Sequence, residues 1–388
     1  MKVFSPWQLA QLSLPNRIVR SSTYEAMATP DGLPTSELEG LYSRLARGGT
    51  GLIITGITSV DATGCCQPVQ TGLYHEGAVP AWRRVTDTVH RHGAAIAVQL
   101  AHAGRQTAAG CGHPPVSPSR FFSTASGRWA RALRPDEIEY IVEAFARSAA
   151  RAQAAGFDAV QINAAHGYLI SGFLTPLTNR RSDRWGKDRC AFLEEVYRAV
   201  RGKVGPGYPV LAKLNLMDFV PGGLSLQAGM EAAHRLAALG IDAIEVSGGI
   251  HETIFFSSRG DIPVGPLVSR LPAWQRPAAA LGLWAMKPLC RFREGFFLPL
   301  AARLRPALKC PLIVVGGLRS PGVIRDTVES GAADAVALSR PLISEPSFPR
   351  QLAAGRQEPA RCRYCNRCIA GVAGQLPLRC YRPAKENI

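Results

Sequence analysis

The chain has 388 residues, of which 46% are hydrophobic and only 19% are charged, and this composition excludes a disordered protein. The formal net charge is +16, but the Lys and Arg residues are scattered over expected helix faces and loops, which argues against nucleic-acid binding. The first residues do not resemble a signal peptide, and no uninterrupted apolar stretch is long enough to cross a membrane. We therefore expect a cytoplasmic protein without nucleic-acid or membrane partners. The sequence is compatible with a homo-oligomer.

Eight short apolar segments recur along the chain, each followed by a polar or Gly-rich turn and a longer amphipathic segment. The predicted strands cover residues 17–22, 51–55, 94–100, 159–163, 209–214, 243–247, 312–315 and 335–339. The clearest helix is predicted over residues 135–155, where apolar residues return every three or four positions. Continuous apolar strands that alternate with helices are typical of a parallel sheet covered on its faces. Eight such units predict an α/β fold, a closed parallel (β/α)8 TIM barrel, over residues 1–355.

Two long stretches interrupt this pattern, and a third region follows the barrel. Residues 105–135 form an expected loop rich in Gly, Pro and Ser, and residues 250–310 form an insertion after the sixth strand. Either stretch can be a lid or wall of an active site, or a surface insertion without such a role. Residues 356–388 are expected to form a short Cys-rich extension.

Polar residues cluster at the ends of the predicted strands. In a TIM barrel the active site lies where strands end and the following loops begin. Ser21, Ser22 and Thr23 end the first strand and Gly56 follows the second. The other polar residues at strand ends are Gln99, Asn163, His166 and Lys213. So many polar side chains at one rim predict a ligand site there.

The last two strands end in a pattern that predicts a phosphate site. Gly316 and Gly317 follow the seventh strand, and Ser339 and Arg340 follow the eighth. Glycines let backbone N–H groups approach an anion closely, and arginine binds it with a planar pair of donors. This pattern does not identify the phosphate ligand, so a lyase or isomerase of phosphorylated substrates stays an alternative.

Several longer motifs together resemble the Old Yellow Enzyme family. The segments NRIVRSSTYE, GLIITG, VQLAHAGRQ, AGFDAVQINAAHGYLISGFLTPLTNRRSDRWG, LAKLN, VVGGL and ALSRPLI occur in the order expected for that family. They are similar to the barrel domain of NADH:flavin oxidoreductases and of bacterial 2,4-dienoyl-CoA reductases, over most of residues 15–349. The resemblance implies an oxidoreductase that binds FMN in the barrel and uses NAD(P)H as co-substrate.

The resemblance also implies roles for the residues at the strand ends. Gln99 would bind the pyrimidine edge of the flavin, and Lys213 would lie near its N1 and O2 atoms. The ring would be lined by Ser21, Ser22, Thr23 and Gly56, and the phosphate bound by Gly316, Gly317, Ser339 and Arg340.

Three residues of the fourth strand and its loop would act on the substrate. Asn163 and His166 would hydrogen-bond a carbonyl oxygen of the substrate, and Tyr168 would donate a proton after hydride transfer from flavin N5. The implied activity is an ene-reductase acting on a small molecule with an activated C=C bond. A flavin-dependent demethylase or dehydrogenase of the same family is the alternative.

Four cysteines gather near the C-terminus with a spacing typical of metal ligands. Cys362, Cys365, Cys368 and Cys380 form the pattern C-x2-C-x2-C-x11-C. Four thiolates at such a spacing can bind an iron–sulfur cluster or zinc. The resemblance to dienoyl-CoA reductases favours a [4Fe–4S] cluster, although that branch has one more residue between the second and third cysteines; zinc, or no metal, stays an alternative.

Overall fold

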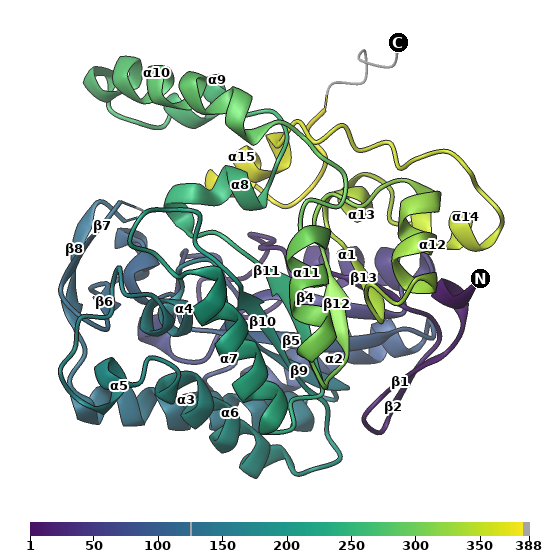
Figure 1. Cartoon of the computed structure of the whole chain (residues 1–388), viewed down its shortest axis with the longest axis horizontal. Coiled ribbons are helices and arrows are strands. Elements are labelled where there is room, and N and C mark those ends of the chain that lie inside the picture. The colour runs from purple at the N-terminus through teal and green to yellow at the C-terminus, as the bar shows by residue number, and fades with distance from the viewer. Residues whose placement is uncertain (125, 383–388) are drawn as a thin grey trace.

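The computed structural model describes residues 1–124 and 126–382, and eight parallel strands form a closed barrel at its centre (Figure 1). Around the barrel the strand order is β10-β11-β12-β13-β3-β4-β5-β9. The strands are β3 (Ile18–Arg20), β4 (Leu52–Ser59), β5 (Ala95–Ala101), β9 (Ala159–Ala164), β10 (Val210–Asn215), β11 (Ala243–Ser247), β12 (Leu312–Val314) and β13 (Ala335–Leu338). Each overlaps one of the eight predicted strands, so the TIM-barrel prediction is confirmed.

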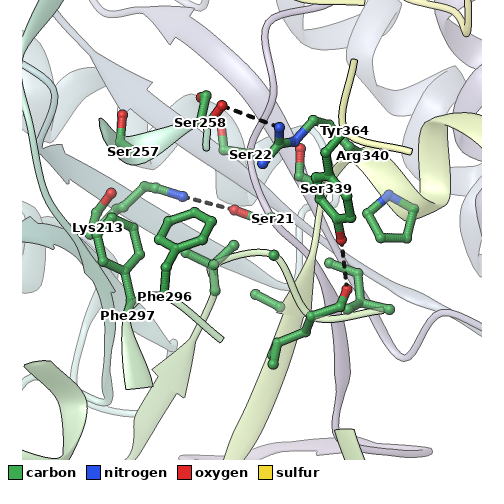
Figure 2. A pocket seen from close by; sticks show the side chains of 18 of the residues that line it. Ser21, Ser22, Lys213, Ser257, Ser258, Phe296, Phe297, Ser339, Arg340 and Tyr364 are labelled. Atoms are coloured by element: carbon green, nitrogen blue, oxygen red, sulfur yellow. Dashed lines mark hydrogen bonds between the residues drawn. The ribbon is translucent and has the colours of Figure 1, made fainter. Parts of the chain in front are cut away.

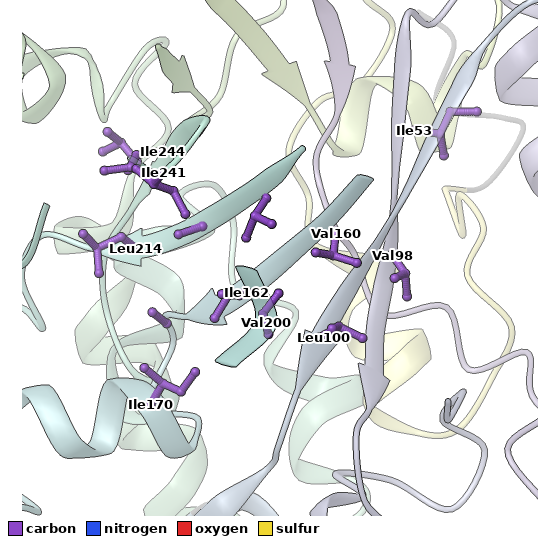
Figure 3. Packing of buried hydrophobic residues seen from close by; sticks show 14 of the residues in the cluster. Ile53, Val98, Leu100, Val160, Ile162, Ile170, Val200, Leu214, Ile241 and Ile244 are labelled. Carbon is purple, nitrogen blue, oxygen red and sulfur yellow. The ribbon is translucent and has the colours of Figure 1, made fainter. Parts of the chain in front are cut away.

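Amphipathic helices cover the outside of the barrel. The main helices are α1 (Ser36–Arg47), α2 (Ala78–His90), α3 (Pro135–Ala154), α6 (Ala191–Val204), α7 (Leu226–Ala238), α11 (Leu298–Leu304), α12 (Pro321–Glu329) and α14 (Phe348–Ala353). Outward-facing strand residues such as Val160, Ile162 and Leu214 are fully buried and belong to one large apolar cluster with the helices (Figure 3). Because both faces of every strand are buried, the strands read as continuous apolar runs.

A short hairpin closes one end of the barrel. Strands β1 (Trp7–Leu9) and β2 (Leu12–Leu14) pair in antiparallel register. Trp7, Leu9 and Leu14 pack with inward-facing residues at the beginnings of the barrel strands, among them Leu52 and Ala95. The N-terminal end of the barrel is therefore filled with apolar side chains, and a ligand site is left to the opposite end.

The expected loop over residues 105–135 contains a small sheet. Strands β6 (Val116–Ser117), β7 (Phe121–Ser123) and β8 (Arg128–Ala132) pair in the order β6-β8-β7. Two short helices, α4 (Leu169–Leu174) and α5 (Arg184–Lys187), follow β9.

The insertion after β11 has two parts that lie in different places. Helix α8 (Ile254–Ser257) lies against the barrel, whereas α9 (Val264–Val268) and α10 (Arg276–Met286) project away from it (Figure 1). Helix α10 has no buried residue, and Trp274 beside it is 80% exposed.

The chain ends over the mouth of the barrel. After α13 (Arg340–Ser344) and α14, the extension forms α15 (Arg367–Ala373) beside α8 (Figure 1). Leu378 N donates a hydrogen bond to Glu25 O at 2.8 Å, which ties the extension to the loop after β3. The last six residues of the predicted extension, 383–388, lie outside the described part. Within the described residues, no helix has the length and apolar character needed to cross a membrane.

Candidate active site

A cavity opens at the C-terminal ends of the strands, as the barrel fold requires (Figure 2). It holds about 580 Å³ of free space, open solvent at its mouth included. Its walls combine strand ends, the insertion and the extension. Among the lining residues are Ser21, Ser22, His166, Lys213, Ser247, Ser257, Ser258, Phe296, Phe297, Gly316, Gly317, Ser339, Arg340 and Tyr364.

The two glycines after β12 are required by the backbone there. Gly316 and Gly317 have φ angles of +127° and +76°, a region that residues with a side chain rarely adopt. A Cβ on Gly316 would lie 3.0 Å from Phe297 N, and one on Gly317 would lie 3.0 Å from Arg293 O. The wall therefore presents bare backbone to the cavity, which suits a ligand bound by peptide N–H groups.

Arg340 lies in the same wall and is buried without a negatively charged partner. Its Nη1 donates to Ser258 O at 3.3 Å, Arg259 O at 2.8 Å and Asn366 Oδ1 at 2.5 Å, and the guanidinium lies 4.4 Å from the centre of the Tyr364 ring. In the described part of the chain no carboxylate pairs with it. Burial lowers the pKa of Arg340, and an anion would compensate its charge. The bare backbone and this guanidinium together fit the phosphate of a cofactor such as FMN.

Lys213 is held inside the barrel by a buried ion pair. Its Nζ donates to Glu245 Oε1 at 2.7 Å and to Ser21 Oγ at 2.8 Å, and the Lys213 and Glu245 side chains are 4% and 0% exposed. Ser21 Oγ also donates to Glu245 Oε1, at 2.5 Å. The positive charge expected beside the flavin is thus partly compensated by a carboxylate.

Gln99 lies at the centre of a second group of hydrogen bonds. Its Oε1 accepts from Ser22 Oγ at 2.8 Å and from Asn163 Nδ2 at 3.0 Å, and its Nε2 donates to Gln161 Oε1 at 2.6 Å. Gln161 Nε2 in turn donates to Glu245 Oε2 at 2.9 Å. The structure therefore brings together Ser22, Gln99 and Asn163, and it connects them with the Lys213 pair.

Gly56 and Thr23 lie behind the cavity wall. Gly56 N donates to Glu25 Oε1 at 2.8 Å, and a Cβ on Gly56 would lie 1.9 Å from Glu25 Oε2. The strand register shifts beside Gly56, between Ile54 and Ile57, as in a β-bulge. Thr23 Oγ1 lies 2.8 Å from Ser339 Oγ. In the described chain neither Gly56 nor Thr23 lines this cavity, and neither do Gln99 and Asn163, so all four lie behind its wall.

A second cavity adjoins the first, and three residues wall both. Its free space is about 850 Å³ including its mouth. His166, Ser257 and Ser258 are shared by the two cavities. The other lining residues are Tyr24, Ile57, Cys66, Gln67, Gln106, Tyr168, Ile250, His251, Ile254, Ile369, Val372 and Ala373.

His166 is fixed in an unusual backbone conformation. Its φ is +61° and that of Gly167 is +75°; a side-chain-bearing residue in this region is costly and often marks a functional site. His166 N donates to Asn215 Oδ1 at 3.2 Å, and its Nε2 lies 2.7 Å from Ser247 Oγ. Burial and the charge of Lys213 lower the pKa of His166 to about 3. The imidazole is therefore neutral at pH 7.

Tyr168 keeps its phenol proton because burial, as at His166, disfavours the charged form. Burial and the neighbouring Cys66 thiol raise the pKa of Tyr168 well above its usual value of 10. The second cavity thus has a neutral imidazole and a protonated phenol in its wall.

The four C-terminal cysteines line a third cavity. Cys362, Cys365, Cys368 and Cys380 are free thiols and all wall this space, together with Arg340. Arg340 opposes the effect of burial, which raises the pKa of Cys362 and Cys368. Among the described residues, no three His, Cys, Asp or Glu side chains are arranged to hold a single metal ion.

Sequence reasoning missed two buried polar residues and one wall of the site. Gln161 and Glu245 join the Gln99 and Lys213 groups, and polar residues at alternate positions of β9 and β11 were the signal for them. The extension was read as a separate metal-binding segment, yet Tyr364 and α15 wall the two adjoining cavities. His251, in the segment after β11, also lines the second cavity.

Comparison with known proteins agrees with this geometry. Residues 2–253 match the NADH:flavin oxidoreductase / NADH oxidase family. The chain is 34% identical to an NADH oxidase of Thermoanaerobacter brockii over 97% of this chain and 55% of that protein. It is 33% identical to a 4,4'-dithiodibutanoate disulfide reductase of Rhodococcus erythropolis, over 95% of this chain and 93% of that protein.

Solved structures show the same fold. A morphinone reductase is 27% identical with a TM-score of 0.71, over 92% of both chains. An Old Yellow Enzyme homologue of Zymomonas mobilis is 25% identical with a TM-score of 0.74, over 94% of this chain and 96% of that one. The chain spans about half the length of the NADH oxidase and of a metal reductase that it also matches, 55% and 53%. On the extent of these matches, the chain belongs to the NADH:flavin oxidoreductase / NADH oxidase family.

Proposed function

We propose that this protein is an FMN-dependent oxidoreductase that uses NAD(P)H to reduce an activated C=C bond of a small molecule. The observation that carries the proposal is the pair of adjoining cavities. One has an uncompensated guanidinium and bare glycine backbone, and the other has the neutral His166 and the protonated Tyr168 in its wall. Family membership supports the use of FMN and a nicotinamide donor.

The residues of the first cavity fit FMN. Arg340, Ser339 and the two glycines would bind its phosphate, and Ser21 and Ser22 would contact the ring. Gln99, which lies behind the cavity wall and accepts a hydrogen bond from Ser22, would hold the pyrimidine edge. Lys213 would place positive charge beside the ring, moderated by Glu245. When bound, FMN supplies a hydride acceptor and donor. The related morphinone reductase was solved in complex with tetrahydroNAD, which supports a nicotinamide cofactor as the source of electrons.

The second cavity would hold the substrate. His166 and Asn163 would donate hydrogen bonds to a carbonyl oxygen, which draws electron density from the β-carbon of an enone. Asn163 Nδ2 already donates to Gln99 Oε1, and its amide carries a second hydrogen for this purpose. Tyr168 would protonate the α-carbon, because its phenol retains the proton at neutral pH.

The test uses the protein as purified, with an absorbance spectrum and anaerobic kinetics. We expect bound FMN, bleaching of its absorbance by NADH or NADPH, and reoxidation by a simple cyclic enone. A colourless protein that does not take up FMN would refute the proposal. Flavin that oxidises an amine but is not reoxidised by enones would instead indicate the dehydrogenase direction.

We also propose that the four C-terminal cysteines bind a [4Fe–4S] cluster. Their thiols all line one cavity, and zinc would need the four sulfur atoms around a single ion. A cluster spreads its four thiolate ligands over a larger body. Iron and sulfide analysis tests this proposal: about four irons per chain are expected, falling in Cys365→Ser, and stoichiometric zinc would contradict it.

A further inference from the structure

Three thiols gather beside the second cavity and have no part in the proposed chemistry. Cys65 and Cys66 lie on the loop after β4, and Cys111 lies on the loop after β5. Cys111 Sγ is 3.1 Å from Cys65 Sγ, and both side chains are partly exposed. The sulfur atoms of a disulfide are about 2.05 Å apart, so an approach of about 1 Å would join these two.

The surroundings distinguish this pair from the third thiol. As thiols, Cys111 donates to Cys65 and Cys65 donates to Gln67 O. When Cys111 loses its proton, the Cys65 thiol donates to the thiolate instead, and this hydrogen bond lowers the pKa of Cys111 and raises that of Cys65. Burial raises the pKa of Cys66 to about 12. Since the thiolate is the nucleophile in thiol chemistry, we expect Cys111 to react before Cys65, and we expect the buried Cys66 to stay unreactive.

We propose that Cys65 and Cys111 form a reversible dithiol–disulfide site that reacts with small organic disulfides. The Cys111 thiolate attacks one sulfur of the disulfide RSSR, so a mixed disulfide forms and one RS⁻ leaves. The Cys65 sulfur then attacks Cys111 Sγ, loses its proton and displaces the second RS⁻. The two cysteines are oxidised to one disulfide, and RSSR is reduced by two electrons to two thiols.

Oxidation of this pair changes the wall of the second cavity. The Cys65 thiol donates a hydrogen bond to Gln67 O at 2.8 Å, and a disulfide has no proton for that bond. Gln67 lines the cavity, and its Oε1 accepts from Gln375 Nε2 of the extension at 2.5 Å. The loop after β5 supplies Gln106 to the same wall. The new bond would tie two loops that shape the cavity, so the redox state of the pair adjusts how substrate fits.

The test treats the anaerobic holoenzyme with glutathione disulfide, blocks free thiols and maps peptides by mass spectrometry. We expect a peptide crosslinked between Cys65 and Cys111 that disappears after reduction. In Cys65→Ser a stable glutathione adduct should accumulate on Cys111. In Cys111→Ser the adduct on Cys65 should form at least tenfold more slowly. Cys190→Ser, at a buried thiol far along the chain, should behave as the wild type.

Two results would overturn the proposal. The first is wild-type protein in which other cysteines react while Cys65 and Cys111 stay alkylatable. The second is equal adduct formation in the two single variants. These mapping results do not depend on enzymatic activity, so they are distinguishable from a failure of the proposed function.

The effect on the cavity, which rests on the proposed function, has its own measurement. The KM for a cyclic enone should change at least threefold on oxidation of the wild type and stay constant in the Cys65→Ser/Cys111→Ser double variant. An unchanged KM in fully crosslinked enzyme would overturn the coupling between the pair and the cavity.

Discussion

The buried pair of Lys213 and Glu245 makes a quantitative prediction about stability. Their charged atoms are 2.7 Å apart and their side chains are 4% and 0% exposed. Removing one partner of such a pair leaves an uncompensated buried charge and costs about 3–5 kcal/mol. For 388 residues the entropy of unfolding is roughly 0.8 kcal/mol per kelvin. The variants Lys213→Met and Glu245→Gln should therefore each lower Tm by about 4–6 °C.

The assay is thermal unfolding of the purified holoenzyme followed by circular dichroism. Glu76→Gln is the matched control, because Glu76 pairs with Arg151 at the same 2.7 Å distance but is 80% exposed. An exposed pair contributes about 0–1 kcal/mol, so Tm should fall by about 1 °C or less. The double variant Lys213→Met/Glu245→Gln should lose less than half the sum of the single losses, because no charge is left unpaired. Single variants with wild-type Tm, or a double variant with the full additive loss, would refute the reasoning.

Three further predictions concern the site. Tyr168→Phe should slow enone reduction by at least 100-fold, which is the lower end of the effect of losing a general acid. Flavin reduction by NADH, followed by stopped-flow absorbance, should stay unchanged. Equal slowing of both half-reactions would contradict the role of Tyr168 as proton donor. Arg340→Met should weaken FMN binding by about 10- to 100-fold, because hydrogen bonds to a charged group contribute roughly 1.5–3 kcal/mol. Titration followed by flavin fluorescence measures this affinity. An unchanged affinity would mean that Arg340 does not bind the phosphate. Since the pKa of His166 is lowered from 6.5 to about 3 and that of Tyr168 is raised above 10, the enone step should not vary between pH 6 and 9. The contribution of the neutral His166 to the free energy of unfolding is complete above pH 6.5 and is lost as the pH falls toward 3. An inflection in the rate of the enone step near pH 6.5 would contradict this prediction, because it would show that His166 becomes charged there.

The barrel was predictable because its signals are local. Ala159, Val160 and Ile162 are apolar and follow a Gly-terminated helix, and the structure has β9 there. Each strand is buried on both faces, so its position can be recognised in the local sequence. Its bounds cannot, because β3 is shorter than the predicted strand over 17–22 and β4 extends to Ser59, beyond the predicted end at residue 55. The glycine pair that predicts a phosphate site could be recognised for the same reason. Gly316 and Gly317 have positive φ angles, a conformation that glycine adopts readily in any surroundings.

The rest of the site depends on contacts between distant parts of the chain. Glu245 on β11 contacts Lys213 on the neighbouring strand β10 and Gln161 on β9, which lies one strand farther around the barrel. These partners are 32 and 84 positions away in the sequence, and nothing in the local sequence of β11 identifies them. Gly56 is predicted at the flavin ring, and in the structure it lies beside a register shift in β4 and donates its N–H to Glu25 Oε1. A one-residue change of register moves a side chain to the other face of a strand, so such assignments require the three-dimensional pairing.

The C-terminal extension connects the first cavity with the cysteine cavity through Arg340. Arg340 walls both the proposed phosphate site and the cysteine cavity, and its position is set by groups from the extension. Asn366 accepts from Arg340 and donates to Ser258 O and Asp261 O at 2.7 and 2.9 Å, while the Tyr364 ring stacks on the guanidinium. A ligand bound by the cysteines would order the segment that carries Tyr364 and Asn366, and so fix the guanidinium that faces the other cavity. We therefore expect that a ligand in the cysteine cavity raises the affinity for the phosphate, and that the phosphate raises the affinity for that ligand by the same factor.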